Sequence, residues 1–322
     1  MKRIANRIAL TVAFLFILCQ SVSAAQLLIP GGQLIGLELG DHTVTVAAFD
    51  DTLGADTRAA GLKVGDRIIR VDTQPVQCAQ DIRQALLRSD GQVELSVLRD
   101  GKAKTLKLRP KITSEGPRLG VYLKQSVTGV GTVTWYDPDT GRFAALGHGV
   151  NNSSGALLDM REGTAYNATV MSVKKGVAGE PGQLLGTLNS AQPIGNLTKN
   201  TVQGIFGTAD QPWQGNPLPI AEASQIRTGP ATIRSTVADR QVQEYSVEIL
   251  KIYPNAKSGG RNMLLRITDP DLLQATGGIV QGMSGSPIIQ DGKLVGAVTH
   301  VLVNDPTTGY GIFIENMLDA AA

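Results

Sequence analysis

The chain has 322 residues, which is more than one domain of ordinary size, so we expect two or three compact units. Its 42% hydrophobic and 18% charged residues exclude a wholly disordered or collagen-like protein, and the net charge of +2 indicates no nucleic-acid partner. The 37 glycines and 15 prolines, with only 4% aromatic residues, favour short strands joined by tight turns over an all-helical bundle.

The first 25 residues have the pattern of an export signal. Three basic residues at positions 2–7 precede an apolar run from Ile8 to Cys19, and small residues at cleavage spacing follow at 21–25. This pattern predicts a signal peptide or a short membrane anchor, with the rest of the chain exported across the cytoplasmic membrane. Only one cysteine, Cys78, would remain in the exported part, so we expect no disulfide framework.

Residues 27–109 predict a small α+β domain. Ala79–Arg88 has apolar residues at helical spacing, and Asp100-Gly101 predicts a hairpin turn. Turn-forming residues at 110–118 predict a linker to the rest of the chain. The expected strands are Leu34–Leu39, Val44–Phe49, Arg67–Val71, Val93–Leu98 and Lys104–Leu108.

Two stretches of this region resemble a bacterial PDZ domain, namely residues 32–37 (GQLIGL) and 59–69 (AAGLKVGDRII). In PDZ domains the turn before a strand presents backbone N–H groups to the terminal carboxylate of a peptide, which then extends the sheet. The resemblance implies that Ile35, Gly36 and Leu37 bind a C-terminal or internal peptide in this way. The alternative is that the glycines before the strand form a turn without any ligand.

Residues 119–322 predict a second, β-rich domain. Many short apolar runs separated by glycine turns are typical of a barrel or a sandwich. The sequence has no phosphate-binding loop, no His-Glu-x-x-His and no paired-cysteine metal motif, so neither a metal nor another cofactor is expected. The expected strands are Thr128–Tyr136, Arg142–Leu146, Thr232–Val237, Tyr245–Ile252, Met263–Ile267, Pro287–Ile289, Leu294–Val298 and Gly311–Ile314.

The glycine-rich segment 277–289 has the features of a nucleophile loop. Ser284 is directly followed by Gly285, and Met283 separates it from Gly282. Glycines let the backbone turn sharply, which exposes the hydroxyl and directs successive N–H groups to one point. The N–H groups of Gly282 and Ser284 are therefore the candidate donors to an acyl oxyanion.

A serine nucleophile needs a base, and the chain contains only His42, His148 and His300. His148 stands between two glycines at the end of an expected strand, which favours it as the base. His42 is expected in an exposed hairpin, and His300 within or at the end of a strand. For each of them a purely structural histidine, held by hydrogen bonds, remains the alternative.

Residues 282–287 (GMSGSP) resemble the Gly-Asp-Ser-Gly-Gly-Pro motif of chymotrypsin-like serine peptidases. Longer stretches resemble the stage IV sporulation protein B peptidase family. The resemblance implies a mainly β protein, in which an N-terminal PDZ-like α+β domain is followed by a chymotrypsin-like double β-barrel peptidase domain. The stretches that resemble this family are residues 145–149, 267–270, 278–288 and 296–306.

The same resemblance implies Ser284 as nucleophile, His148 as general base and Asp269 as the acid that orients the imidazole. Asp269 lies only shortly before the serine, unlike the aspartate of ordinary chymotrypsin-like peptidases, which follows the histidine. Asp159 and Asp210 are the alternatives for the acid. Asp269-Pro270 is also a common start of a turn.

By this resemblance the protein is an exported serine endopeptidase of the sporulation checkpoint, located between the forespore and mother-cell membranes, either free or membrane-tethered. It would cleave itself and a membrane-bound regulatory protein, so that a late sigma factor becomes active. The PDZ domain would govern self-association, self-cleavage or substrate recruitment. Two alternatives stay open: a catalytically silent PDZ-containing peptide-binding scaffold, and a general HtrA-like quality-control protease, although HtrA-like proteases have PDZ domains after the protease.

Overall fold

The computed structural model describes residues 26–152, 155–237, 241–256 and 260–322. The predicted signal peptide or anchor, residues 1–25, lies outside this part of the chain. In the described residues, no helix is both long enough and apolar enough to cross a bilayer.

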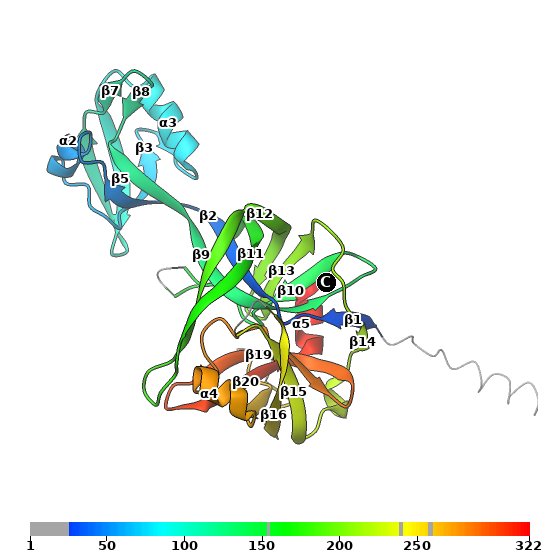
Figure 1. Ribbon diagram of the computed structural model, residues 1–322. Coiled ribbons are helices and arrows are strands. Elements are labelled where there is room, and N and C mark those ends of the chain that lie inside the picture. Colours follow the sequence, from blue (N-terminus) through cyan, green and yellow to red (C-terminus); the bar gives the residue numbers. More distant parts are fainter. Residues whose placement is uncertain (1–25, 153–154, 238–240, 257–259) are drawn as a thin grey trace, which may run out of the picture.

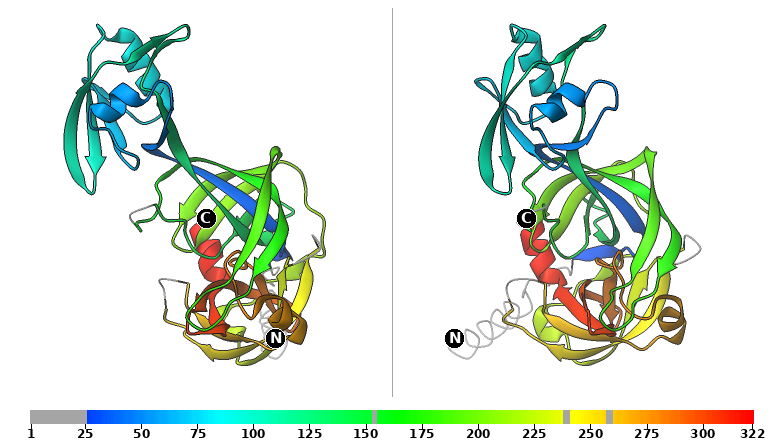
Figure 2. Two further views of the ribbon diagram at one scale, coloured as in Figure 1. Left: turned by 60° about the vertical axis from the view of Figure 1, so that its left-hand side comes forward. Right: turned by 90° about the vertical axis from the view of Figure 1, so that its left-hand side faces the viewer.

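A larger domain is formed by two β-barrels that lie next to each other, and a smaller domain stands away from them (Figures 1 and 2). Each barrel closes from six strands within the described residues. The first closes because β9 pairs with β10 on one edge and with β2 on the other, and the second closes because β15 pairs with both β16 and β18. The strands of the first barrel are β2 (Leu34–Phe49), β9 (Val121–Tyr136), β10 (Arg142–Ala145), β11 (Met160–Lys174), β12 (Gln183–Thr201) and β13 (Gly204–Ala209).

The second barrel comes entirely from the C-terminal part of the chain. With the first barrel and the small α+β domain, it confirms the predicted mainly β fold with a chymotrypsin-like double barrel. Its strands are β15 (Gly229–Ser235), β16 (Gln243–Ile252), β17 (Met263–Ile267), β18 (Pro287–Gln290), β19 (Lys293–Leu302) and β20 (Asp305–Phe313).

Buried apolar side chains fill each barrel and also the seam between them. Phe143 lies in the core of the first barrel, and Ile288 in that of the second. At the seam Trp135 of the first barrel and Ile312 of the second belong to one cluster, together with Met317 of the C-terminal helix α5 (Ile314–Ala321). Because this shared cluster is excluded from water, the two barrels are held in a fixed relation and so is the cleft between them.

The small domain packs one helix, α3 (Ala79–Arg88), on a short sheet, as the sequence predicts. Its Asp66 is fully buried and forms an ion pair with Arg99, at 2.6 Å between Oδ1 and Nε. The predicted turn at Asp100-Gly101 is confirmed by positive φ angles at both residues. The other elements are α2 (Ala55–Ala59), β3 (Arg67–Val71), β4 (Gln74–Pro75), β5 (Val93–Arg99) and β6 (Lys102–Leu108).

This domain is inserted into the first barrel instead of preceding it. Strand β2 pairs with β9 on both sides of an irregularity between Gly40 and Thr45, but only Ile35–Asp41 also pairs with the barrel strand β11. From Val44 onward β2 pairs with β3, and its side chains join the core of the small domain. Figure 1 shows β2 leaving the barrel and β9 returning to it side by side.

The domain boundaries therefore differ from the predicted ones. Part of the region predicted as PDZ-like, 27–109, belongs to the barrels, because β1 (Leu27–Pro30) and the first half of β2 pair there. The predicted linker at 110–118 forms a β-hairpin, made of β7 (Lys111–Thr113) and β8 (Gly116–Arg118), which packs against α3. The start of the region predicted as peptidase, 119–322, contributes Leu119 to the core of the small domain.

The long hairpin of β11 and β12 was not expected from the sequence. These strands contain many threonines, asparagines and glycines, and most of their side chains are exposed or half-buried. Strand patterns are recognised by alternating large apolar residues, and few are present here. The remaining short elements are β14 (Leu218–Pro219), the 3-10 helix η1 (Ala223–Gln225) and α4 (Pro270–Thr276).

Candidate active site

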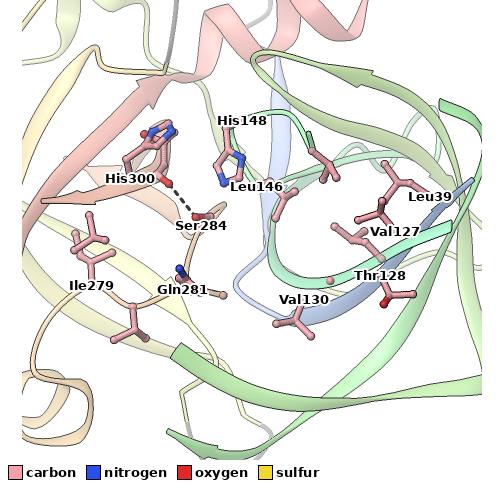
Figure 3. Close-up of a pocket in the computed structure, with 17 residues that line it drawn as sticks. Leu39, Val127, Thr128, Val130, Leu146, His148, Ile279, Gln281, Ser284 and His300 are labelled. Carbon is pink, nitrogen blue, oxygen red and sulfur yellow. Dashed lines mark hydrogen bonds between the residues drawn. The ribbon is translucent and has the colours of Figure 1, made fainter. Parts of the chain in front are cut away.

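A cavity of about 420 Å³ lies between the two barrels. Ser284 and His300 line it from the second barrel, and His148 lines it from the first. Figure 3 shows these three side chains gathered in one region of the cleft. The two residues predicted as nucleophile and base, far apart in the chain, are thus brought to the same cavity. Among the described residues, no group of three or more His, Cys, Asp or Glu could hold a metal ion.

Ser284 lies in the loop between α4 and β18, and β9 of the first barrel holds this loop. The Thr132 hydroxyl donates to the carbonyl of Gly282 at 2.7 Å, and the Thr132 N–H donates to the carbonyl of Ser284 at 2.9 Å. The hydroxyl of the buried Thr134 donates to the carbonyl of Gly285 at 2.8 Å. These bonds fix the backbone of the nucleophile loop against the wall of the other barrel.

Glycine is required on both sides of the serine. Gly282 has a φ of 100° and Gly285 a φ of 97°, which residues with a side chain rarely adopt. A Cβ atom at Gly285 would also clash with the carbonyl oxygen of Thr132. The close approach between this loop and β9 therefore depends on a bare backbone.

The loop leaves two N–H groups free to bind a substrate oxygen. Within the described part of the chain, the N–H groups of Gly282 and Ser284 have no acceptor, whereas those of Met283 and Gly285 donate to the carbonyls of Val280 and Val298. Both free donors belong to residues that line the cavity. Two free donors beside a serine are the arrangement that an oxyanion hole needs, and Gly282 and Ser284 remain the predicted donors.

The β11–β12 hairpin supports the other end of the same loop. Gln281 donates its N–H to the carbonyl of Gly182 at 2.9 Å, and its carbonyl accepts from the N–H of Leu184 at 2.8 Å. Further along the hairpin, Gly176 donates to the carbonyl of Thr276 at 2.8 Å. An element that was absent from the sequence prediction thus holds the residue directly before the oxyanion donors.

His148 follows β10 in a tight turn, in which Leu146 has a φ of 71° and Gly147 a φ of 67°. Its Nδ1 lies 3.0 Å from the carbonyl oxygen of Gly149, so Nδ1–H donates and Nε2 keeps its lone pair. Burial lowers the pKa of His148 below its ordinary value of 6.5, and the ring is neutral at neutral pH. A neutral imidazole with a free Nε2 is the form that a general base requires.

His300 lies next to His148, and this contact was not predicted from the sequence. The two ring centroids are 5.3 Å apart, and Nδ1 of His300 is buried without a hydrogen-bond partner in the described structure. Burial, followed by repulsion from His148 in its protonated form and from Arg261, lowers the pKa of His300 to about 4. His300 is therefore also uncharged at neutral pH.

The hydroxyl of Ser284 donates to the carbonyl of Thr299 at 2.9 Å and not to an imidazole (Figure 3). The bond between nucleophile and base is thus unformed in this state. Catalytic hydrogen bonds are often long or absent without substrate, so the absence of this bond does not exclude the pair.

The prediction of Asp269 as the orienting acid is wrong in this structure. Asp269 is the N-cap of α4, where its Oδ1 accepts the N–H of Leu272 at 3.0 Å and its Oδ2 accepts the N–H of Ser246 at 3.2 Å. Neither Asp159 nor Asp210 lines the cavity, and no acidic side chain of the described residues does. An aspartate followed by proline is a common start of a helix, which is the signal that could have indicated this role.

We expect Asp269→Ala to cost stability and not catalysis. Loss of an N-cap side chain lowers the free energy of unfolding by about 0.5–2 kcal/mol. Denaturant unfolding should show this loss, while kcat/KM for a short peptide stays within about threefold of wild type. Asp269→Ser is the matched control, because serine also caps helices and should restore stability. A loss of activity by orders of magnitude with unchanged unfolding would restore Asp269 to the catalytic set.

The prediction that Ile35, Gly36 and Leu37 bind a peptide is also wrong. All three lie in β2 between two paired neighbours, with Gly36 opposite Val130 of β9 and Tyr166 of β11. Both edges of this segment are therefore already occupied by strands. The sequence correctly indicates a turn before a strand, but this strand, β2, belongs here to the first barrel.

The groove of the small domain lies elsewhere, between α3 and residues 119–123, which include the start of β9. A cavity of about 370 Å³ is lined there by Ile82 and Leu86 of the helix, by Arg83 beside them, and by this strand segment. Gly120, with a φ of 68°, directly precedes the strand. Leu119-Gly120 before a strand resembles Ile35-Gly36, and it was overlooked because it directly follows the expected linker, 110–118, at the start of the region predicted as peptidase.

A model of the SpoIVB peptidase S55 family matches residues 115–318, which is more than half of the chain. The chain belongs to this family. It is a serine endopeptidase, and a PDZ domain model matches its residues 35–109. No curated protein matches the chain.

Solved structures similar to this S55 peptidase include the active form of the Rv3671c protease from M. tuberculosis. It is 14% identical over 60% of this chain and 73% of that chain, with a TM-score of 0.37. The PDZ domain of the SdrC-like protein (Lmo2051) from Listeria monocytogenes is 21% identical over 26% of this chain and 87% of that chain, with a TM-score of 0.22.

Proposed function

We propose that Ser284 is the nucleophile and His148 the general base of this serine endopeptidase. The observation behind the proposal is that both residues line one cleft, beside two free backbone donors. The hydroxyl of Ser284 turns from Thr299 to Nε2 of His148 and gives up its proton there as Oγ attacks the peptide carbonyl. The N–H groups of Gly282 and Ser284 then bind the oxyanion.

The rest of the cycle follows from proton balance. His148 passes its new proton to the leaving amine, which departs and leaves an acyl-serine. A water molecule then gives a proton to Nε2 and attacks the ester, and that proton returns to Oγ as the acid product leaves. The carbonyl of Gly149 holds the tautomer of His148 in place of the usual carboxylate.

A fluorophosphonate probe tests this assignment. An activated serine reacts with the probe, whereas an ordinary surface serine does not. We expect one label on the folded protein, on the peptide that contains Ser284, and none after unfolding. A protein that remains folded and unlabelled, while it still binds peptides, would instead support the silent scaffold.

For the cell, we propose a sporulation-checkpoint peptidase that is exported between the forespore and mother-cell membranes. Membership of the S55 family and the leader pattern in residues 1–25 support this. The substrates would be the chain itself and a membrane-bound regulatory protein whose cleavage leads to late sigma-factor activation. The groove between α3 and β9 would bind a C-terminal or internal peptide, either of the substrate or of a second copy.

Mixing experiments distinguish this role from quality control. The active protein should cleave a Ser284→Ala copy at one or a few sites and leave an unfolded model protein such as reduced casein largely intact. Rapid degradation of the unfolded protein, with no cleavage of the copy, would favour the HtrA-like alternative.

A further inference from the structure

The cleft has two apolar halves, one from each barrel. Figure 3 shows Ile279 and Gln281 on the side of Ser284, and Leu39, Val127 and Val130 on the opposite side beyond Leu146. Among the described residues that line the cavity, none is Lys, Arg, Asp or Glu. The two histidines are the only ionisable lining groups in this part of the chain, and both are neutral at neutral pH.

The free backbone donors determine which half receives which part of the substrate. The carbonyl that is attacked has its oxygen at the N–H groups of Gly282 and Ser284. The side chain of the same substrate residue is attached to the adjoining carbon, so it falls into the half of the cleft next to the donors. The walls of this half are residues 279–282 and Thr299–Val301.

This half is rigid as well as apolar. Ile279 and Val280 are 2% and 1% exposed and belong to the core of the second barrel. Ile279 donates its N–H to the carbonyl of Pro306 at 2.7 Å, and its Cδ1 would lie only 2.6 Å from a Cβ atom at Gly309. The isoleucine therefore packs directly on the bare backbone of β20.

The third apolar side chain, Val301, lies at the end of β19. It is half-buried and packs against the core of the second barrel. At Val301, one edge of β19 pairs with Gly309 of β20, whereas the other has no strand partner within the described residues because the pairing with β18 ends at Ala297. A substrate side chain that enters this half meets Val301 on one wall and, on the other, the uncharged surface over the buried Ile279 and Val280.

We propose that Val301, beside the uncharged wall formed over Ile279 and Val280, selects an aliphatic side chain in the substrate residue whose carbonyl is attacked. This inference rests on the proposed role of Ser284. An aliphatic side chain gains free energy by leaving water here, whereas a charged side chain would be buried without a partner. Val301 is the residue of this site that can be substituted with the least effect on the core, because it is only half-buried.

A peptide series that varies only the residue before the scissile bond tests the proposal. We expect kcat/KM for Leu, Ile, Val or Met to exceed that for Lys, Arg or Asp by about 100-fold or more. Val301→Asp should reduce cleavage after Leu and increase cleavage after Lys or Arg by about tenfold. Val303→Asp is the matched control, because Val303 is 47% exposed, lies outside the cleft and should leave the preference unchanged.

A second variant keeps the proposal testable if Val301→Asp does not fold. Val301→Phe fills the same half without introducing charge and should shift the preference from Leu to Ala. Fluorophosphonate labelling of each protein separates the two proposals. Absence of labelling in the wild type would overturn the role of Ser284. A labelled wild type that cleaves equally well after Leu, Lys and Asp, or a Val301→Phe variant that is labelled but keeps its preference for Leu, would overturn the aliphatic site alone.

Discussion

Ser284→Ala is expected to reduce kcat/KM by roughly 10⁵-fold while the protein stays folded. The hydroxyl makes one hydrogen bond, to the carbonyl of Thr299, so its removal should lower the free energy of unfolding by only about 1 kcal/mol. The measurement is hydrolysis of a short peptide together with thermal unfolding. If the variant cleaves itself or a peptide at the wild-type rate, Ser284 is not the nucleophile.

Ser286 provides a matched control in the same loop. Its hydroxyl is buried and has no hydrogen-bond partner in the described structure. Ser286→Ala should therefore leave activity near wild type and stability unchanged or slightly raised, because a buried polar group without a partner is removed. Equal loss of activity in both variants would indicate damage to the loop and not to the chemistry.

His148→Ala is expected to cost about as much activity as Ser284→Ala, and the double variant little more, because the two residues act as a unit. His300→Ala should retain at least a tenth of the wild-type kcat/KM, since its ring is a neighbour of the base and receives no proton in the proposed cycle. The reverse result, with the large loss at His300, would make His300 the base.

The pH dependence gives an independent check on the same base. A general base must be unprotonated, so activity falls as the pH drops through its pKa. Because burial lowers the pKa of His148, the acid limb of the kcat/KM profile should lie below pH 6.5. An acid limb above pH 7 would indicate an ionised carboxylate next to the base, and none of the described residues that line the cleft supplies one.

The parts of the site that depend on local chemistry were predictable. The backbone geometry around Ser284 and His148 requires glycines, so both positions could be recognised from the sequence. Helix α3 matched its predicted bounds because its apolar spacing is regular. The neighbour of the base could not be predicted in this way, because His300 meets His148 only when two barrels pack together.

The errors also have physical causes. Gly40 to Thr43 resembles a turn between two strands, yet β2 continues through it with an irregular register, so the crossing between domains was hidden. Asp269 was assigned to the chemistry from the family resemblance of residues 267–270, although its place shortly before the serine departs from the chymotrypsin-like order. In space its two oxygens are already used by backbone N–H groups.

Insertion of the small domain into the β2–β9 hairpin limits how the protein can be divided. Cutting the chain before residue 119 would remove β1 and β2, and with β2 a wall of the first barrel. The small domain could instead be removed by deleting the segment between Gly40 and Ser126. These two residues are directly paired, so a tight turn between them would close the hairpin of β2 and β9. The ends of the PDZ domain are adjacent for the same reason, which suits a module acquired or lost as a single block within an intact barrel.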